Sequence, residues 1–238
     1  MRTNRKPKDY FDNYLKLEED DIDYFEHSLK NGEVKEEMIP SVKRKLFTQS
    51  LHLWIAKYSM GMPVEELKTT FCEVITRFKT GWKDKGNSPE DNIHFDNYML
   101  MLWMLSLGVL LNIEQTEFEK LVDVLEQSNR EDYFFDQIIA YRIPERTIST
   151  KITYPDQFMF LKNLICTKSV SELKNYLDKS WYSSIKHTYW HNNDKSTQHT
   201  FFGYWSFETA VFIKITGLDD AIIKDQEYYP YDLVHQNF

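Results

Sequence analysis

Residues 201–238 of this 238-residue chain read FFGYWSFETAVFIKITGLDDAIIKDQEYYPYDLVHQNF and carry the strongest structural signal in the sequence. In the segment 203–216, apolar side chains fall on every side of the helix that the sequence predicts. Tyr204, Phe207 and Val211 follow spacings of three and four residues, and other apolar residues fill the remaining faces. A helix of this kind must be enclosed by other helices, which predicts a buried C-terminal helix in an all-helical protein.

The end of this helix and the tail beyond it are also marked in the sequence. Gly217 is expected to end the helix, because glycine readily takes the left-handed conformation of helix C-termini. Asp219 or Asp220 is then expected to cap a short turn over residues 221–224. Since proline fixes its own backbone angle, Pro230 predicts an extended, exposed path for the tyrosine-rich tail.

The rest of the chain shows the period of helices almost everywhere, and strand-like alternation is hard to find. We therefore predict an all-α fold, a compact bundle of about nine or ten antiparallel helices. The first helices are expected over residues 9–30 and 41–58 and from Val64 onward, and a long core helix from a start at 88–91 to Asn112.

Two capping boxes predict helix starts in the second half of the chain. Thr116 precedes Glu119, and Ser169 precedes Glu172, by the spacing at which the two side chains can cap each other's backbone. A further helical piece near residue 181 is expected before a polar loop at 191–200.

Charge gives a second indication of function, because the formal net charge is −8 and the acidic residues are clustered. An acidic protein repels nucleic-acid phosphates and attracts basic proteins, so direct nucleic-acid binding is disfavoured. The alternative interpretation of each cluster is a solvated face that keeps the protein soluble. The first candidate partner-binding surface is the tail, with Asp219, Asp220, Asp225, Glu227, Tyr228, Tyr229, Tyr231 and Asp232, and the second comprises Glu18, Glu19, Asp20, Asp21 and Asp23.

Cysteine usage and hydropathy indicate a cytoplasmic protein. Cys72 and Cys166 each lie within an apolar pattern, which favours thiols in the core over a disulfide framework. The N-terminus lacks the apolar run of a signal peptide, and the longest apolar run, residues 99–111, is too short to span a bilayer. No membrane partner is expected.

Catalytic motifs are weak throughout the sequence. His187, His191, Asp194 and His199 can be drawn as a metal site, but histidines among aromatic residues more often pack or face solvent. The sequence has no phosphate-binding glycine loop, no CxxC pair and no GxSxG motif. We expect no metal, no cofactor and no catalytic residue.

Glu208 is an acidic residue within an otherwise apolar helix, and burying it requires hydrogen-bond donors. Indole or phenol groups such as those of Trp181, Tyr182 or a tail tyrosine are the expected partners. An enzyme that uses Glu208 with His187 or His191 is the alternative, and it requires these side chains to converge. The expected structural motif comprises Trp181, Tyr182, Tyr204, Trp205 and Glu208.

The C-terminal half contains GYWSFE at 203–208, GLDD at 217–220 and YYPYDL at 228–233, preceded by Trp181, Tyr182 and Trp190. In order and spacing these motifs resemble the C-terminal signature of the PoNi-like immunity proteins, which neutralise polymorphic nuclease toxins of bacteria. YSMG at 58–61 and the residues after it are similar to the N-terminal helical segment of that family. On this basis we expect an N-terminal segment, 1–115, and a C-terminal segment, 116–238, packed as one globular unit.

The resemblance implies a cytoplasmic, non-catalytic protein that binds a cognate DNase toxin and occludes its active or DNA-binding site. Acidic side chains would pair with the lysines and arginines that hold DNA phosphates. The alternative is an acidic helical adaptor that binds another basic protein without affecting a nuclease. The sequence leaves the toxin and the oligomeric state open, including a homo-oligomer.

Overall fold

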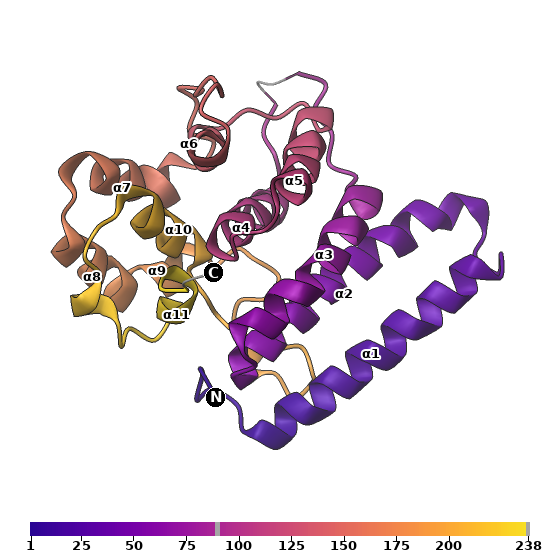
Figure 1. Ribbon diagram of the computed structural model, residues 1–238. Helices are drawn as coiled ribbons and strands as arrows, with labels where there is room; N and C mark the ends of the chain where they lie inside the picture. Colours follow the sequence, from indigo (N-terminus) through magenta and orange to yellow (C-terminus); the bar gives the residue numbers. More distant parts are fainter. Residues whose placement is uncertain (89–90, 237–238) are drawn as a thin grey trace. The chain divides into compact units, whose positions relative to one another are not determined.

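The computed structural model describes residues 1–88 and 91–236. Within these residues the secondary structure is made of α-helices and short 3-10 helices, without a β-strand (Figure 1). This confirms the predicted all-α fold. Eleven α-helices are present in the described part of the chain, and nine of them are long.

The chain divides into two compact units. Unit 1 comprises Met1–Lys83 and Asn192–Gly203, and unit 2 comprises Asp84–His191 and Tyr204–Phe238. Each unit is therefore built from two separate stretches of sequence. The division into segments at residues 115 and 116 stays a prediction.

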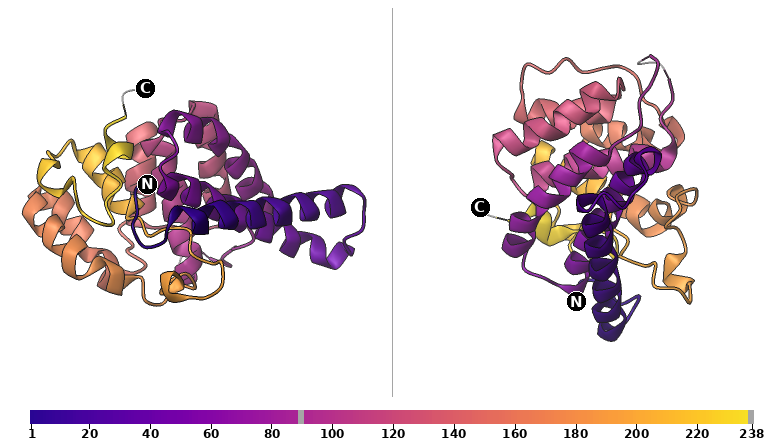
Figure 2. Two further views of the ribbon diagram at one scale, coloured as in Figure 1. Left: turned by 90° about the horizontal axis from the view of Figure 1, so that it is seen from below. Right: turned by 90° about the vertical axis from the view of Figure 1, so that its right-hand side faces the viewer.

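Unit 1 is a set of three long helices in which α2 packs against both α1 and α3 (Figures 1 and 2). Gly61 ends α2 in the left-handed conformation, with a φ of 99°. The elements of unit 1 are α1 (Lys8–Lys30), η1 (Glu36–Met38), α2 (Ile39–Met60), α3 (Val64–Gly81) and η2 (Asn193–Lys195).

The packing of α1 decides which of its side chains remain exposed. Ile22 of α1 lies in a buried cluster with Val42, Leu46 and Leu53 of α2. Near the other end of α1, the Tyr10 hydroxyl accepts a hydrogen bond from the Phe201 backbone N–H at 2.7 Å. One side of α1 is thus fixed to unit 1, and the opposite side faces solvent.

Unit 2 is organised around α4 and α10, and most residues of these two helices are buried. The Trp103 and Phe207 rings meet at 5.8 Å, and the Phe134 and Phe212 rings at 5.7 Å. Among the described residues, no helix combines the length and the apolar character needed to span a membrane. The elements are α4 (Phe95–Leu110), α5 (Gln115–Gln127), α6 (Tyr133–Arg142), α7 (Pro155–Thr167), α8 (Val170–Lys179), α9 (Trp181–Ser184), α10 (Phe207–Thr216), η3 (Ala221–Ile223) and α11 (Tyr231–Val234).

The predicted start of the long core helix is wrong. Helix α4 begins at Phe95, and its predicted start at 88–91 includes two residues, 89 and 90, that lie outside the described residues. The Asp91 carboxylate accepts the backbone N–H groups of Asn87 and Ser88 at 2.7 and 3.3 Å. Such local bonds between a side chain and the backbone compete with helix formation.

Two further local predictions differ from the structure. Helices α5 and α8 begin close to the predicted capping boxes, but neither has a side-chain cap hydrogen bond. Helix α10 begins at Phe207 instead of Gly203, because Gly203 has a φ of 130° and the Ser206 N–H bonds the Tyr228 carbonyl at 2.8 Å. The predicted end of α10 at Gly217 is confirmed by a φ of 64°.

Candidate functional site

The acidic surface on α1 contains both paired and unpaired carboxylates. Lysines of α2 hold two of them: Lys45 contacts Asp21 at 2.8 Å, and Lys57 contacts Glu19 at 2.8 Å. The hydrogen bond from Lys45 is the largest influence that lowers the pKa of Asp21. Glu18 is half-buried and accepts from a glutamine of α2, and its burial raises its pKa. These acids belong partly to the α1–α2 contact.

Asp20 and Asp23 differ from their neighbours. Both are exposed, and their carboxylates make no ion pair or hydrogen bond within the described part of the chain. Tyr24 follows directly and exposes 64% of its surface, and Leu17, one turn before Asp20, exposes 47%. Sequence reasoning missed these two apolar side chains, although their spacing of seven places them on the same side of a helix.

The tail differs from its predicted exposed path. Tyr228 and Tyr229 are buried, with 9% and 3% of their surface exposed, and Asp220 exposes 2%. The Tyr229 hydroxyl donates to Asp220 Oδ2 at 2.6 Å, and His235 Nε2 lies 2.7 Å from Asp220 Oδ1. Burial raises the pKa of Tyr229 well above its usual range. The exposure expected of Tyr228, Tyr229 and Asp220 is therefore wrong, because the tail folds back onto unit 2.

The remaining tail residues form a small exposed surface. Asp219 accepts the Ala221 backbone N–H at 3.1 Å, so the predicted cap at this position is confirmed. Asp225 and Glu227 are exposed, whereas Tyr231 and Asp232 are partly exposed. Ile222 exposes 56% of its surface between them in the sequence. Acidic side chains of the tail therefore lie at the surface, whereas Tyr228 and Tyr229 do not.

The predicted structural motif is brought together inside unit 2. Trp181 Nε1 donates to Glu208 Oε1 at 2.6 Å, and the Ser206 hydroxyl donates to the same oxygen at 2.7 Å. The Trp181 ring meets Tyr228 at 4.6 Å, and Tyr182 meets Tyr204 at 5.2 Å. Trp205 is also buried. The expected indole partner of Glu208 is thus present, in a buried aromatic cluster.

Glu208 exposes only 1% of its surface, and its Oε2 atom has no hydrogen-bond partner among the described residues. Burial raises the pKa of this carboxyl, against the opposing effect of the Ser206 and Trp181 hydrogen bonds. No histidine is among its contacts. The convergence of Glu208 with His187 or His191 that the enzyme alternative requires does not occur in the described structure.

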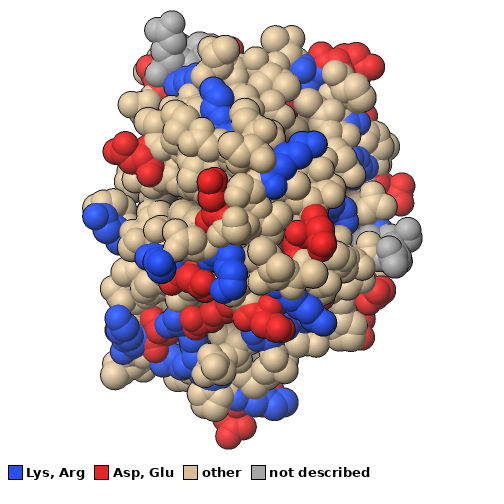
Figure 3. Space-filling view, turned by 90° about the vertical axis from the view of Figure 1, so that its left-hand side faces the viewer, with Lys and Arg blue, Asp and Glu red and all other residues tan. Residues whose placement is uncertain are grey.

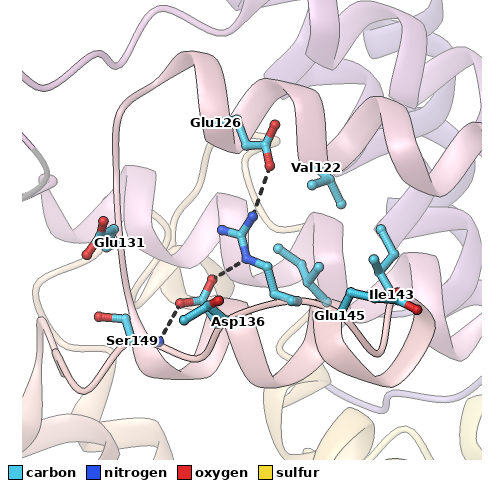
Figure 4. A pocket seen from close by; sticks show the side chains of 10 residues that line it. Val122, Glu126, Glu131, Asp136, Ile143, Glu145 and Ser149 are labelled. Atoms are coloured by element: carbon cyan, nitrogen blue, oxygen red, sulfur yellow. Dashed lines mark hydrogen bonds and ion pairs between the residues drawn. The ribbon is translucent and has the colours of Figure 1, made fainter.

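A cavity of about 520 Å³ in unit 2 contains a second buried acid that sequence reasoning missed. Asp136 accepts from Arg146 Nε at 2.8 Å and from the Ser149 N–H at 2.9 Å, and Arg146 also contacts Glu126 at 2.9 Å. Figure 4 shows the carboxylates of Glu126 and Asp136 bridged by this guanidinium. The charges hold the segment after α6 in place. An isolated acid within the apolar run YFFDQII was the signal available in the sequence.

Among the described residues, no group of three or more His, Cys, Asp or Glu side chains is placed to hold a metal ion. Asp194 pairs with Arg5 at 2.8 Å, and His199 lies 2.8 Å from Asn13. Cys72 and Cys166 are free but exposed, so the prediction of core thiols is wrong. Each faces outward from an amphipathic helix whose apolar neighbours turn inward.

Charge is not uniform over the surface. On the face drawn in Figure 3, lysine and arginine side chains lie among the aspartates and glutamates. The net charge of −8 therefore does not by itself define a binding site. Local groups of exposed acids, such as those of α1 and the tail, have to be compared side chain by side chain.

Comparison with known protein families identifies the class of protein. The family model of the PoNe immunity protein (PoNi) N-terminal domain matches residues 5–123, and that of the PoNi C-terminal domain matches residues 130–233. The chain belongs to the PoNe immunity protein family. Membership implies immunity to a polymorphic nuclease toxin.

The fold is shared with a solved structure. The crystal structure of protein PA2201 from Pseudomonas aeruginosa superposes with a TM-score of 0.67 and 16% sequence identity, covering 98% of this chain and 89% of that one. At this identity the likeness concerns the fold alone. None of the curated proteins compared with the chain matches it.

Proposed function

We propose that this protein binds a cognate DNase toxin in the cytoplasm of the producing cell and occludes its active or DNA-binding site. Membership in the PoNe immunity protein family is the observation that carries the proposal. Exposed carboxylates without a partner among the described residues, such as Asp20 and Asp23, support an electrostatic contact with a basic protein.

The mechanism follows from competition for one set of cationic groups. A nuclease needs lysines and arginines to hold nucleic-acid phosphates, and neutralising them removes much of its affinity for the substrate. Carboxylates of the immunity protein can pair with the same groups, and opposite charges also speed the encounter. No cofactor and no chemical step by this chain is needed. Glu208 has a structural role in this proposal, because its carboxylate lies in the core.

The direct test is a DNA-cleavage assay with the nuclease encoded by the neighbouring gene. Addition of the immunity protein in equimolar amount is expected to abolish cleavage, because a one-to-one complex covers the site. Bovine serum albumin at the same concentration controls for non-specific protection. Undiminished cleavage at a large molar excess would contradict the proposal. Binding without inhibition would instead favour the adaptor alternative.

A further inference from the structure

We propose that the outward face of α1, centred on Tyr24, is the surface that contacts the cationic nucleic-acid-binding surface of the nuclease. This inference rests on the proposed function and names its contact surface. The outward face of α1 comprises Leu17, Asp20, Asp23 and Tyr24.

The first observation is an aromatic side chain that the fold leaves unpacked. Tyr24 exposes 64% of its surface, the largest fraction among the exposed large hydrophobic residues of the described chain. Within the described residues, its one ring contact is with the adjacent Phe25, at 5.2 Å. Leu17 exposes 47% on the same side of the helix. Folding alone does not explain these exposures, because the buried side of α1 is already filled by residues such as Ile22.

The second observation is the charge around that side chain. Helix α1 carries eight acidic residues against three lysines, a formal charge of −5. At the border with α2, Glu19 and Asp21 are paired with lysines of that helix. Asp20 and Asp23 have no such partner within the described residues. The outward face therefore keeps carboxylates that are available to an external cation.

An aromatic residue bordered by charged groups matches the composition of protein-binding hot spots, in which tyrosine and arginine are enriched. Nucleic-acid phosphates require a surface rich in arginine and lysine. Arginine can pair with a carboxylate and also stack on a tyrosine ring. The outward face of α1 offers both groups one helical turn apart, at Asp20 and Tyr24.

The same charges argue against two other assignments. A second copy of this chain would bring the unpaired carboxylates Asp20 and Asp23 of two α1 helices together, which like-charge repulsion opposes. The tail keeps Asp219 and Asp225 exposed, but Tyr228 and Tyr229 are buried and cannot serve as anchors without opening unit 2. The outward face of α1 is thus the better match to a cationic nuclease.

The test compares variants of this face with matched controls on the full chain. The α1 variants are Tyr24→Ala and the double substitution Asp20→Asn with Asp23→Asn. The first control is Tyr141→Ala, because Tyr141 lies on α6 and exposes 47% of its surface. The second control is the double substitution Asp219→Asn with Asp225→Asn in the tail. Surface plasmon resonance with a catalytically inactive form of the neighbouring-gene nuclease, at several salt concentrations, gives both rate constants. Circular dichroism confirms that each variant is folded.

Tyr24→Ala is expected to raise Kd by about tenfold or more, mainly through faster dissociation, as for an interface hot spot. The double Asn variant should associate more slowly and with a weaker salt dependence, because long-range attraction is screened over about 8 Å at physiological ionic strength. The Kd of both control variants should stay within about twofold of the wild-type Kd.

Wild-type affinity of both α1 variants, with a loss in the tail variant, would overturn the inference and move the contact to the tail. A dimer of the wild type that Tyr24→Ala dissociates in sedimentation experiments would assign the face to a second copy. Absence of wild-type binding is a different result, since it would contradict the proposed function itself. The wild-type measurement thus separates failure of the function from failure of the surface.

Discussion

Replacing Trp181 by alanine is expected to lower the free energy of unfolding by about 3–5 kcal/mol, the range seen for large aromatic side chains in cores. Trp181 is fully buried and packs against Tyr228. Its indole N–H is also a hydrogen-bond donor to the buried Glu208 carboxylate. The substitution leaves a cavity and an acid that has lost one of its two side-chain donors, and both effects act in the same direction.

Denaturant unfolding followed by tryptophan fluorescence and circular dichroism measures this loss. Trp181→Phe should cost less than Trp181→Ala, because it keeps a ring in the cavity while removing the N–H group. Tyr141→Ala, an exposed position on α6, is the control and should shift the midpoint little. A wild-type midpoint for Trp181→Ala would show that the aromatic cluster of unit 2 does not stabilise the fold.

Replacing Glu208 by alanine is expected to lower the free energy of unfolding by about 1–3 kcal/mol, because the Trp181 and Ser206 donors lose their acceptor in the core. Affinity for the nuclease should change little once the variant is folded. Denaturation and binding measured on the same sample separate the two effects. Lost binding at an unchanged denaturation midpoint would overturn the structural assignment of Glu208.

Comparing Glu208→Gln with the wild type as a function of pH shows whether the ionised Glu208 carboxyl stabilises or destabilises the folded protein. Burial raises the pKa of Glu208 in the folded protein above its ordinary value of 4.5, so the folded state binds this proton more tightly than the unfolded state. Its contribution to stability is complete below about pH 4.5 and is lost as the pH rises through the raised pKa. The wild type should therefore lose stability relative to Glu208→Gln as the pH rises above about 4.5. If the difference in the free energy of unfolding between the wild type and Glu208→Gln did not change with pH, the raised pKa of Glu208 would be contradicted.

The helical period and the apolar segments of the sequence were sufficient to predict the fold class. The apolar core helix α4, the buried α10 and its end at Gly217 all follow from side-chain pattern and glycine chemistry. The start of α4 could not be predicted in this way. The Asp91 carboxylate accepts the Asn87 backbone N–H, a local hydrogen bond that competes with helix formation and that the helical period does not reveal.

The candidate site was predictable only in part. The acidic clusters and the buried Glu208 were visible in the sequence, because an acid among apolar residues needs a donor. The exposure of the tail tyrosines was predicted wrongly, since Pro230 constrains one backbone angle but not the direction in which the tail packs. Tyr24 was overlooked because an aromatic residue on an amphipathic helix is usually buried, and its exposure becomes visible only once α1 is packed on α2.

Competition between this protein and DNA for the catalytically inactive nuclease measures occlusion directly. A fluorescent DNA duplex is first bound to the nuclease, and the immunity protein is then titrated in while anisotropy is followed. Because both ligands need the same cationic groups, the duplex should be released completely, with a midpoint that rises in proportion to the DNA concentration. A stable ternary complex, with the duplex and the immunity protein bound to the nuclease together, would contradict occlusion.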